Sequence, residues 1–318
     1  MGQMREVLAK CLEEMMRKDP KVVLIDSDLA SANGTLKLRK LFPERALDVG
    51  IAEQNMASVA AGMASYGLRP YITSFAPFAT RRLCDQMAIS IAYAKQNVKI
   101  IGTDPGITAE LNGGTHMGIE DIGVVRSIPG MTIFEPSDSV QLAAALPVID
   151  RYVGPVYMRF NRRELADFHG KDYQFDLFRA DVLREGTDVT VAACGLLVGP
   201  VLKLAEKLYA EEGISVEVLD VHTIKPIDEE TLLASTTKTG CCVTVENHNV
   251  VGGLHSAVLE ALAKKPVPCT KIGILDRSGE VGKLPYLREA MKMTDEDILL
   301  AIKVITSVRS THQVCYAN

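Results

Sequence analysis

Short runs of β-branched and aliphatic residues alternate with longer stretches of helical periodicity along most of this chain. In its first half, such runs stand at 22–26, 70–75, 98–102, 131–136 and 155–160. Runs of this kind are typical of buried strands, and the apolar spacing between them is typical of amphipathic helices. Strands that alternate with helices favour a parallel sheet that is covered on both faces. The alternation therefore predicts an α/β fold.

The alternation breaks once, between Asn161 and Gly186, where charged and aromatic residues follow no clear period. Beyond that break it resumes, with strand-like runs at 188–194, 214–221, 241–247 and 267–274. We therefore predict two doubly wound α/β domains. The first is expected over residues 1–165, a linker over 166–187, and a smaller second domain over 188–318.

The composition is that of an ordinary globular protein, and it argues against several classes of function. Of the 318 residues, 47% are hydrophobic and 24% are charged, which is far from the polar balance of disordered chains. The net charge of -5 and the lack of a lysine- and arginine-rich run argue against nucleic acid as a partner. The seven cysteines show neither the spacing of metal ligands nor that of a disulfide framework.

Targeting and membrane segments are not evident in the sequence. Residues 1–20 have the mixed charge of an amphipathic helix and lack the uninterrupted apolar region of a signal peptide. No run of about 18 apolar residues occurs. Together with the scattered cysteines, these observations predict a cytoplasmic protein with no membrane partner.

One carboxylate lies on an apolar stripe. The segment ALDVGIAEQNMASVAAGMA passes from a strand through a turn at Gly50 into a helix, and Glu53 precedes Met56 by three residues and Ala60 by seven. Glu53 therefore shares the face that packs against the core. A glutamate in a first helical turn can simply complement the helix dipole, so the pattern alone leaves both a structural and a functional role open.

Two further segments carry candidate functional side chains. Phe75 and Phe78 follow the end of a predicted strand, at the edge where open α/β sheets bind ligands. His116 lies in a glycine-bearing loop and can move protons near neutral pH. Core packing of the phenylalanines and local hydrogen bonding of the histidine stay open as alternatives. Dinucleotide, phosphate-loop, hydrolase-elbow and zinc-protease motifs are absent from the sequence.

Seven motifs in their order along the chain resemble the C-terminal half of transketolase. The resemblance runs from about Arg5 to Val304 and is carried by DSDLASAN, DVGIAEQNM, SFAPFATR, NGGTHMGIED, SIPGMTIFEPSD, VENHNVVGG and DRSGEVG. It implies one subunit of a split enzyme that depends on thiamine diphosphate and transfers a two-carbon ketol unit from a ketose to an aldose. The partner would be an N-terminal subunit that holds the cofactor diphosphate and Mg²⁺ or Ca²⁺, and the assembly would be an α2β2 heterotetramer. No metal ligand is expected on this chain.

The resemblance also implies roles for single residues. Glu53 matches the glutamate that hydrogen-bonds the aminopyrimidine ring of the cofactor, and Phe75 and Phe78 match aromatics that pack on that ring. Asp28 matches a further cofactor contact, whereas Arg81 replaces an aromatic residue near the pyrimidine. His116 matches a histidine that lies near the reacting carbons, contacts the substrate and helps proton transfers.

At the substrate positions the sequence departs from the family pattern. Arg5 and Arg159 are expected to match arginines that grip a sugar phosphate, but Ala32 replaces a serine and Asp104 replaces a histidine. Asn112 replaces an aspartate that reads the hydroxyl groups of the donor. A carboxylate near a phosphate would oppose its binding. We therefore predict a modified sugar substrate, for example a branched or sulfonated one.

Rival functions share parts of this pattern. The β subunit of a 2-oxoacid dehydrogenase E1 component has the same two domains and the same activating glutamate, but the stretch GGTHMGIEDIGVVRSIPGM favours transketolase. A synthase of the deoxyxylulose phosphate type is normally one long chain. From another class, the chain could be a non-catalytic subunit that only stabilises a partner. The presence of Glu53, His116 and both phenylalanines argues against this last reading.

Overall fold

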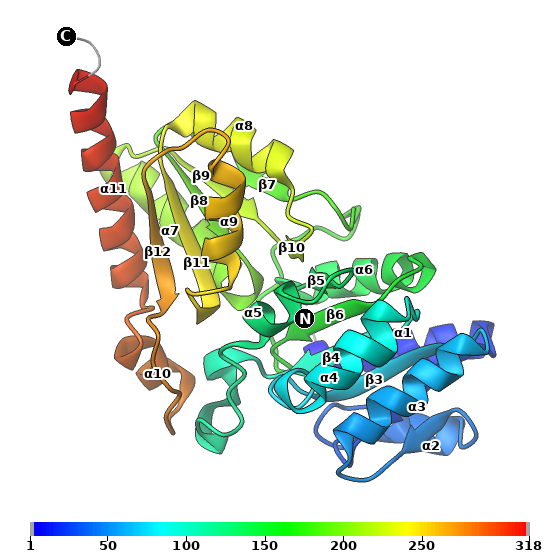
Figure 1. The fold of residues 1–318 in the computed structure, drawn as a ribbon. Coiled ribbons are helices and arrows are strands. Elements are labelled where there is room, and N and C mark those ends of the chain that lie inside the picture. The colour runs from blue at the N-terminus through cyan, green and yellow to red at the C-terminus, as the bar shows by residue number, and fades with distance from the viewer. Residues whose placement is uncertain (1–2, 316–318) are drawn as a thin grey trace.

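The computed structural model describes residues 3–315, with side chains as far as Val308. Within that range two α/β units lie side by side, each built around one sheet (Figure 1). This confirms the predicted fold class. Each predicted run overlaps a strand, and these strands are β1 (Val22–Asp26), β3 (Arg69–Phe75), β4 (Lys99–Thr103), β5 (Thr132–Phe134), β6 (Val156–Phe160), β8 (Val189–Ala193), β9 (Val216–Asp220), β11 (Cys242–Asn249) and β12 (Cys269–Ile274).

The first sheet has the strand order β10-β5-β6-β4-β3-β1-β2, in which β2 (Ala46–Asp48) and β10 (Thr223–Lys225) are short edge strands. The strands pair in parallel except for β10, which runs antiparallel to β5. Every residue of β1, β4, β5 and β6 is buried. Strands that are covered on both faces need apolar side chains on both, which explains their continuous apolar runs.

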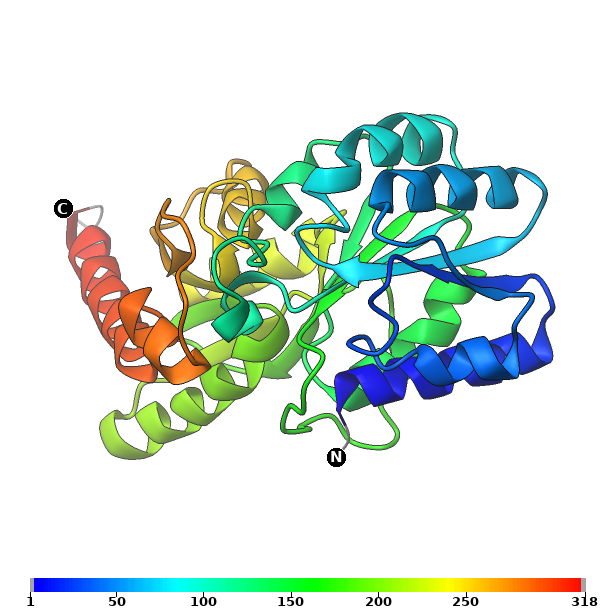
Figure 2. The same cartoon turned by 90° about the horizontal axis from the view of Figure 1, so that it is seen from below.

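Helices cover both faces of this sheet (Figure 2). On one face, α1 buries Met4, Leu8, Leu12 and Met16, which recur every four residues along one side of the helix. The covering helices are α1 (Met4–Lys18), α2 (Leu36–Leu41) and α6 (Ser139–Arg151) on one face, and α3 (Glu53–Ser65), α4 (Cys84–Gln86), the π-helical η2 (Met87–Tyr93) and α5 (Asp121–Arg126) on the other. Short 3₁₀ turns are η1 (Arg81–Leu83), η3 (Gly106–Asn112) and η4 (Gly195–Leu197).

The second sheet has the order β12-β11-β8-β9-β7, with β7 (Asp181–Arg184) antiparallel to β9. One face is covered by α7 (Val198–Glu212) and α11 (Asp295–Cys315), and the other by α8 (Glu229–Thr239) and α9 (Leu254–Leu262). Near the lower end of α11 lies α10 (Leu284–Ala290) (Figure 1). The model has no helix between residues 3 and 315 with the length and apolarity that a membrane crossing needs.

Two short strands belong to sheets that the predicted domain boundaries do not assign to them. β7 falls within 166–187 and joins the second sheet, whereas β10 falls within 188–318 and completes the edge of the first. The limits at 165 and 187 stay a prediction.

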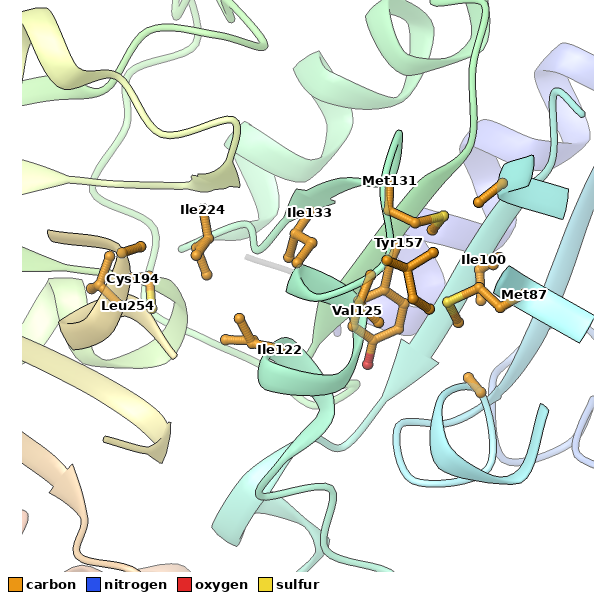
Figure 3. Close-up of a cluster of buried hydrophobic side chains, with 14 of the residues drawn as sticks. Met87, Ile100, Ile122, Val125, Met131, Ile133, Tyr157, Cys194, Ile224 and Leu254 are labelled. Atoms are coloured by element: carbon orange, nitrogen blue, oxygen red, sulfur yellow. The ribbon is translucent and has the colours of Figure 1, made fainter. Parts of the chain in front are cut away.

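One apolar cluster runs from the first unit into the second (Figure 3). It joins Ile100 and Tyr157 of the first sheet to Cys194, Ile224 and Leu254 of the second half. The two units therefore share a core.

Candidate active site

Most candidate residues follow the carboxyl ends of adjacent parallel strands. In the order β6-β4-β3-β1-β2, the chain supplies Arg162 after β6, Asp104 after β4, Phe75 at the end of β3, Asp28 after β1, and Glu53 after β2. The carboxyl ends of parallel strands meet at one edge of a sheet, where open α/β folds bind ligands. The topology therefore gathers residues that are far apart in the sequence.

Glu53 is the first residue of α3, and only 2% of its surface is exposed to solvent. The turn before it needs a positive φ at Gly50 (73°), which glycine adopts without strain. The carboxylate of Asp48 braces this turn by accepting the N–H groups of Gly50 (2.9 Å) and Asp28 (3.0 Å). An open cavity of about 430 Å³ lies here, lined by residues 51–55 and Arg82. Its volume is within the range of small-molecule sites.

Arg82 is a residue that the sequence reasoning did not select. Its Nη1 donates to Oε1 of Glu53 at 2.7 Å, and its guanidinium carbon lies 3.9 Å from the centre of the Phe78 ring. A planar cation therefore rests on an aromatic face while it donates to a buried carboxylate. The Arg82 side chain is 41% exposed, so its position is not fixed by surrounding packing.

Phe75, Phe78 and His116 form one aromatic cluster. The ring centres of Phe75 and Phe78 are 6.2 Å apart, and His116 lies 6.1 Å from the first and 5.2 Å from the second. Nδ1 of His116 contacts Oγ1 of Thr115 at 2.9 Å. The other ring nitrogen, Nε2, is then the one available to a bound molecule.

The loop that carries His116 is held at both ends. Arg81 is exposed and pairs with Glu120 at 2.6 Å, and it also donates to the carbonyl of Thr115. It therefore braces the His116 loop. At the other end, Oδ1 of Asn247 on β11 accepts the N–H of Ile107, and Nδ2 donates to the carbonyl of Pro105. Sequence reasoning missed Asn247 as a site residue, although it lies in the VENHNVVGG motif.

Asp104 is buried and is not an isolated negative charge. Its Oδ2 lies 2.7 Å from Nε of Arg162, and its Oδ1 accepts the N–H of Arg162 at 3.2 Å. Burial raises the pKa of Asp104 above its usual value, although the charge of Arg162 opposes that shift. Arg162 also lies over Phe75, 5.1 Å from the ring centre.

Two arginines converge on the backbone at Ala32. Arg5 and Arg162 both donate to its carbonyl oxygen, at 3.2 Å and 3.4 Å. Both guanidinium groups are partly exposed and keep further N–H donors. The sequence predicts Arg5 and Arg159 as a substrate-binding pair. In the structure, the arginine that lies beside Arg5 at Ala32 is Arg162.

Arg159 has a different environment, which argues against the substrate role predicted for it. Its side chain is 0% exposed, and its three nitrogens lie within 3.0 Å of oxygens of Asp121, Glu135 and Asn247. These partners come from both halves of the chain. Within β6 the side chain points into the protein, whereas Arg162 follows the strand end and faces the site.

Two other predicted residues lie at the surface of this region. Asp28 is exposed and has a left-handed backbone (φ 59°). Asn112 is exposed at the end of η3, just before Gly113.

Comparison with known proteins agrees with this arrangement. The family model for the transketolase pyrimidine-binding domain matches residues 2–167, and the model for the transketolase C-terminal domain matches residues 179–298. The chain is 48% identical over 304 residues to the 6-deoxy-6-sulfo-D-fructose transketolase subunit SqwH of Clostridium sp. (strain MSTE9), which covers 95% of this chain and 94% of that protein.

Two further relatives extend the comparison. The chain is 34% identical over 275 residues to an apulose-4-phosphate transketolase subunit of Phocaeicola vulgatus, with 86% of this chain and 88% of that protein covered. A solved structure described as a split gene transketolase, an inactive β4 tetramer, superposes with a TM-score of 0.87 at 38% identity, covering 96% of this chain and 99% of the other.

These relatives favour a transketolase over a dehydrogenase β subunit and over a non-catalytic subunit. Matched domains, overall fold and the grouping of Glu53, both phenylalanines and His116 at one sheet edge lead to the same assignment. The chain belongs to the transketolase family, as the subunit of a split enzyme that carries the pyrimidine-binding and C-terminal domains.

Proposed function

We propose that Glu53 is the carboxylate that activates thiamine diphosphate in a transketolase acting on a sulfonated ketose. Membership of the family implies dependence on this cofactor. When bound, thiamine diphosphate supplies the reactive carbon that cleaves the ketose and carries its two-carbon unit to an aldose. Glu53 would hold the ring nitrogen N1' by a hydrogen bond from a site that excludes water, and Phe75 and Phe78 would pack on the ring.

The position of Arg82 is the observation that supports this fit. Its guanidinium is flat, rests on Phe78 and donates an N–H to Glu53. An aminopyrimidine ring is also flat, and its ring nitrogen can share a proton with a carboxyl group. Arg82 therefore marks the place of the ring, and its exposed side chain would move aside when the cofactor binds.

His116 is proposed to move protons to and from the substrate. It lies at the edge of the Phe78 ring, next to the proposed cofactor position, with Nδ1 engaged by Thr115. Positioned acid–base groups of this kind contribute about 10²- to 10⁴-fold to a rate. Asp28 and Asn112 are proposed to contact cofactor and donor hydroxyl groups from the rim.

The anionic end of the sugar is proposed to bind between Arg5 and Arg162. The Asp104 carboxylate reduces the positive charge of this pair, so the site suits a sulfonate with one charge better than a phosphate with about two. The 48% identity to a 6-deoxy-6-sulfo-D-fructose transketolase subunit supports the same class of donor. We propose Arg162 in place of Arg159 as the substrate-binding arginine of this strand.

A partner subunit is proposed to complete the site. The diphosphate ligands and the divalent cation, Mg²⁺ or Ca²⁺, would come from an N-terminal subunit in an α2β2 assembly. Large apolar side chains are exposed along α3 and η2, namely Ile51, Tyr66, Ile89 and Tyr93, and Ile51 also lines the Glu53 cavity. Exposed apolar surface of this kind is typical of a subunit interface.

Reconstitution with the partner subunit tests this function. With thiamine diphosphate and Mg²⁺, the pair should turn over 6-deoxy-6-sulfofructose with a kcat/KM at least tenfold above that for xylulose 5-phosphate. Glu53→Gln should lower kcat by about 100-fold or more, because N1' would lose its acidic partner. Glu44→Gln, at an exposed position before β2, is the matched control and should keep full activity.

The same assay separates the substrate site from the cofactor site. Arg162→Met should raise the KM for the sulfonated sugar by about tenfold while the cofactor requirement is unchanged, because one charged donor is lost. Arg163→Met serves as its control, since Arg163 is exposed and pairs with Glu110. A preference for xylulose 5-phosphate would rule out the proposed donor, and full activity of Glu53→Gln would rule out the proposed catalytic role.

A further inference from the structure

A group of histidine and aspartate side chains lies where the connecting segment meets both domains. Single ligand atoms of His169, Asp181 and Asp220 lie within 4.8 Å of one another. Asp181 on β7 is the direct cross-strand partner of Asp220 on β9. Like charges that face each other across two strands destabilise a sheet. Asp220 is fully buried, so water cannot screen this pair.

Hydrogen bonds leave three atoms of this group unpaired. Nε2 of His169 lies 3.8 Å from Oδ2 of Asp181, which is too long for a hydrogen bond. Among the residues that the structure describes, this nitrogen, Oδ1 of Asp220 and Nε2 of His222 are buried without any hydrogen-bond partner. Native proteins rarely leave such atoms unpaired, because each one costs free energy.

Outer contacts orient two of these side chains. Nδ1 of His169 is held by the Asp138 carboxylate at 2.9 Å, so the opposite ring nitrogen faces Asp181. Ser137 and Gln141 both donate to Oδ2 of Asp220, which leaves its Oδ1 free. A carboxylate behind the far nitrogen of a histidine is the usual support for a metal-binding imidazole.

His222 lies beside the group, although its ring nitrogens are not within 4.8 Å of all three ligand atoms. Its side chain is 0% exposed, its Nδ1 contacts Oγ1 of Thr223 at 3.0 Å, and its Nε2 lies 3.9 Å from Oδ2 of Asp181. Burial is the main reason why the pKa of His222 falls to about 4, so its ring is neutral at physiological pH and can bind a metal. Burial also raises the pKa of Asp220 to about 7, although the charge of His169 opposes that shift.

We propose that this chain binds one Zn²⁺ ion through His169, Asp181 and Asp220, with His222 as a fourth ligand after a shift of its ring. Imidazole nitrogens and carboxylate oxygens are common zinc ligands. Despite burial, the hydrogen bond with Asp138 raises the pKa of His169 to about 9, so binding of the ion would release a proton from His169. The ion would satisfy the three unpaired atoms and the cross-strand carboxylates together. It would join the connecting segment to β9 and, through Asp138, to α6 of the first domain. These residues are separate from the candidate active site, so the role is structural.

Metal titration of the full-length chain tests the proposal. After treatment with a chelator, the wild-type protein should bind one Zn²⁺ per chain at submicromolar concentration, and its Tm should rise by several degrees. His169→Gln and Asp181→Asn should each weaken binding by at least 100-fold. His116→Gln removes a histidine outside the group and should bind as the wild type does.

A second measurement does not depend on variants that fold. Co²⁺ added to the wild-type chain should give the visible absorption bands of a four-coordinate site, and Zn²⁺ should displace them. Failure of the wild-type chain to bind either ion at micromolar concentration would overturn the proposal. Equal Zn²⁺ binding by well-folded His169→Gln protein would also overturn it. Either result would leave the proposed catalytic function untouched, because Glu53 and His116 take no part in this site.

Discussion

At the scale of single residues, the contact between Arg82 and Glu53 bears on the catalytic role that we propose for Glu53. A buried carboxylate is costly without a partner, and Arg82 provides one before any cofactor is present. The same contact would compete with the cofactor, because the guanidinium covers the Phe78 ring where the aminopyrimidine is proposed to pack. Arg82 is thus expected to stabilise the site without cofactor and to weaken the binding of thiamine diphosphate.

Replacing Arg82 by methionine tests this competition. The unbranched apolar side chain can still cover Phe78 but cannot donate to Glu53. Half-maximal activity of the reconstituted enzyme should then need several-fold less thiamine diphosphate, and the Tm of the free chain should fall because Glu53 loses its partner. Arg151→Met, at an exposed position at the end of α6, is the control. An increased cofactor requirement for Arg82→Met would mean that Arg82 helps to hold the cofactor.

The sequence motifs predict Glu53, Phe75, Phe78 and His116 in one site, and the structure brings the rings of both phenylalanines and His116 together. Arg159 was selected because it matches the family motif. Its burial depends on partners from both halves of the chain, which the sequence alone does not reveal. Arg162 follows the strand end at Phe160, at the edge where open α/β sheets bind ligands.

At the scale of elements, β11 of the second domain positions a loop of the first. Asn247 is fully buried, and its side chain satisfies both Ile107 and Pro105 ahead of the His116 loop. Gly106 lies between these two residues with φ 55°, and a Cβ there would overlap the Asn247 side chain. Close approach of the two backbones therefore requires glycine.

An Asn247→Ala substitution should separate positioning from binding. It leaves two buried backbone groups unpaired, so we expect a loss of about 1 to 3 kcal/mol in the free energy of unfolding. The kcat should fall about tenfold as His116 loses its fixed position, with little change in cofactor requirement. Asn249→Ala, on the same strand, is the control. Unchanged kcat in a correspondingly destabilised protein would refute the positioning role.

The strands that sequence reasoning found mostly have five or more residues, with β2 and β5 as shorter exceptions. β7 and β10 were missed because each has only three or four residues and forms through pairing with a distant strand. Such edge strands depend on tertiary contacts more than on local preference. The buried charges of Arg159, Asp121 and Glu135 were hidden for the same reason.

At the scale of the whole molecule, the two family domains do not divide cleanly. β10 completes the first sheet although it belongs to the second half of the sequence, and the shared apolar cluster continues between the units. Arg159 is neutralised by Asp121 and Glu135 and also donates to Asn247 across the junction. The units are therefore expected to unfold together.

Truncation tests this coupling. A chain of residues 1–178 retains the matched pyrimidine-binding domain but lacks β10 and Asn247. It should expose the edge of β5 and an apolar surface, so we expect aggregation and a Tm at least 10 °C below that of the full chain. Size-exclusion chromatography and thermal melting by circular dichroism provide the measurements. A monomeric fragment with the full-length Tm would show that the domains are independent.

The donated strand β10 also sets an order for folding during synthesis. A nascent chain that has left the ribosome only as far as the connecting segment has every parallel strand of its first sheet but not the edge that protects β5. That edge stays open until residue 225 has emerged. During this interval, the open edge of β5 is available to other nascent chains on the same messenger RNA. Slow translation between the two halves of the sequence should therefore lower the yield of folded protein.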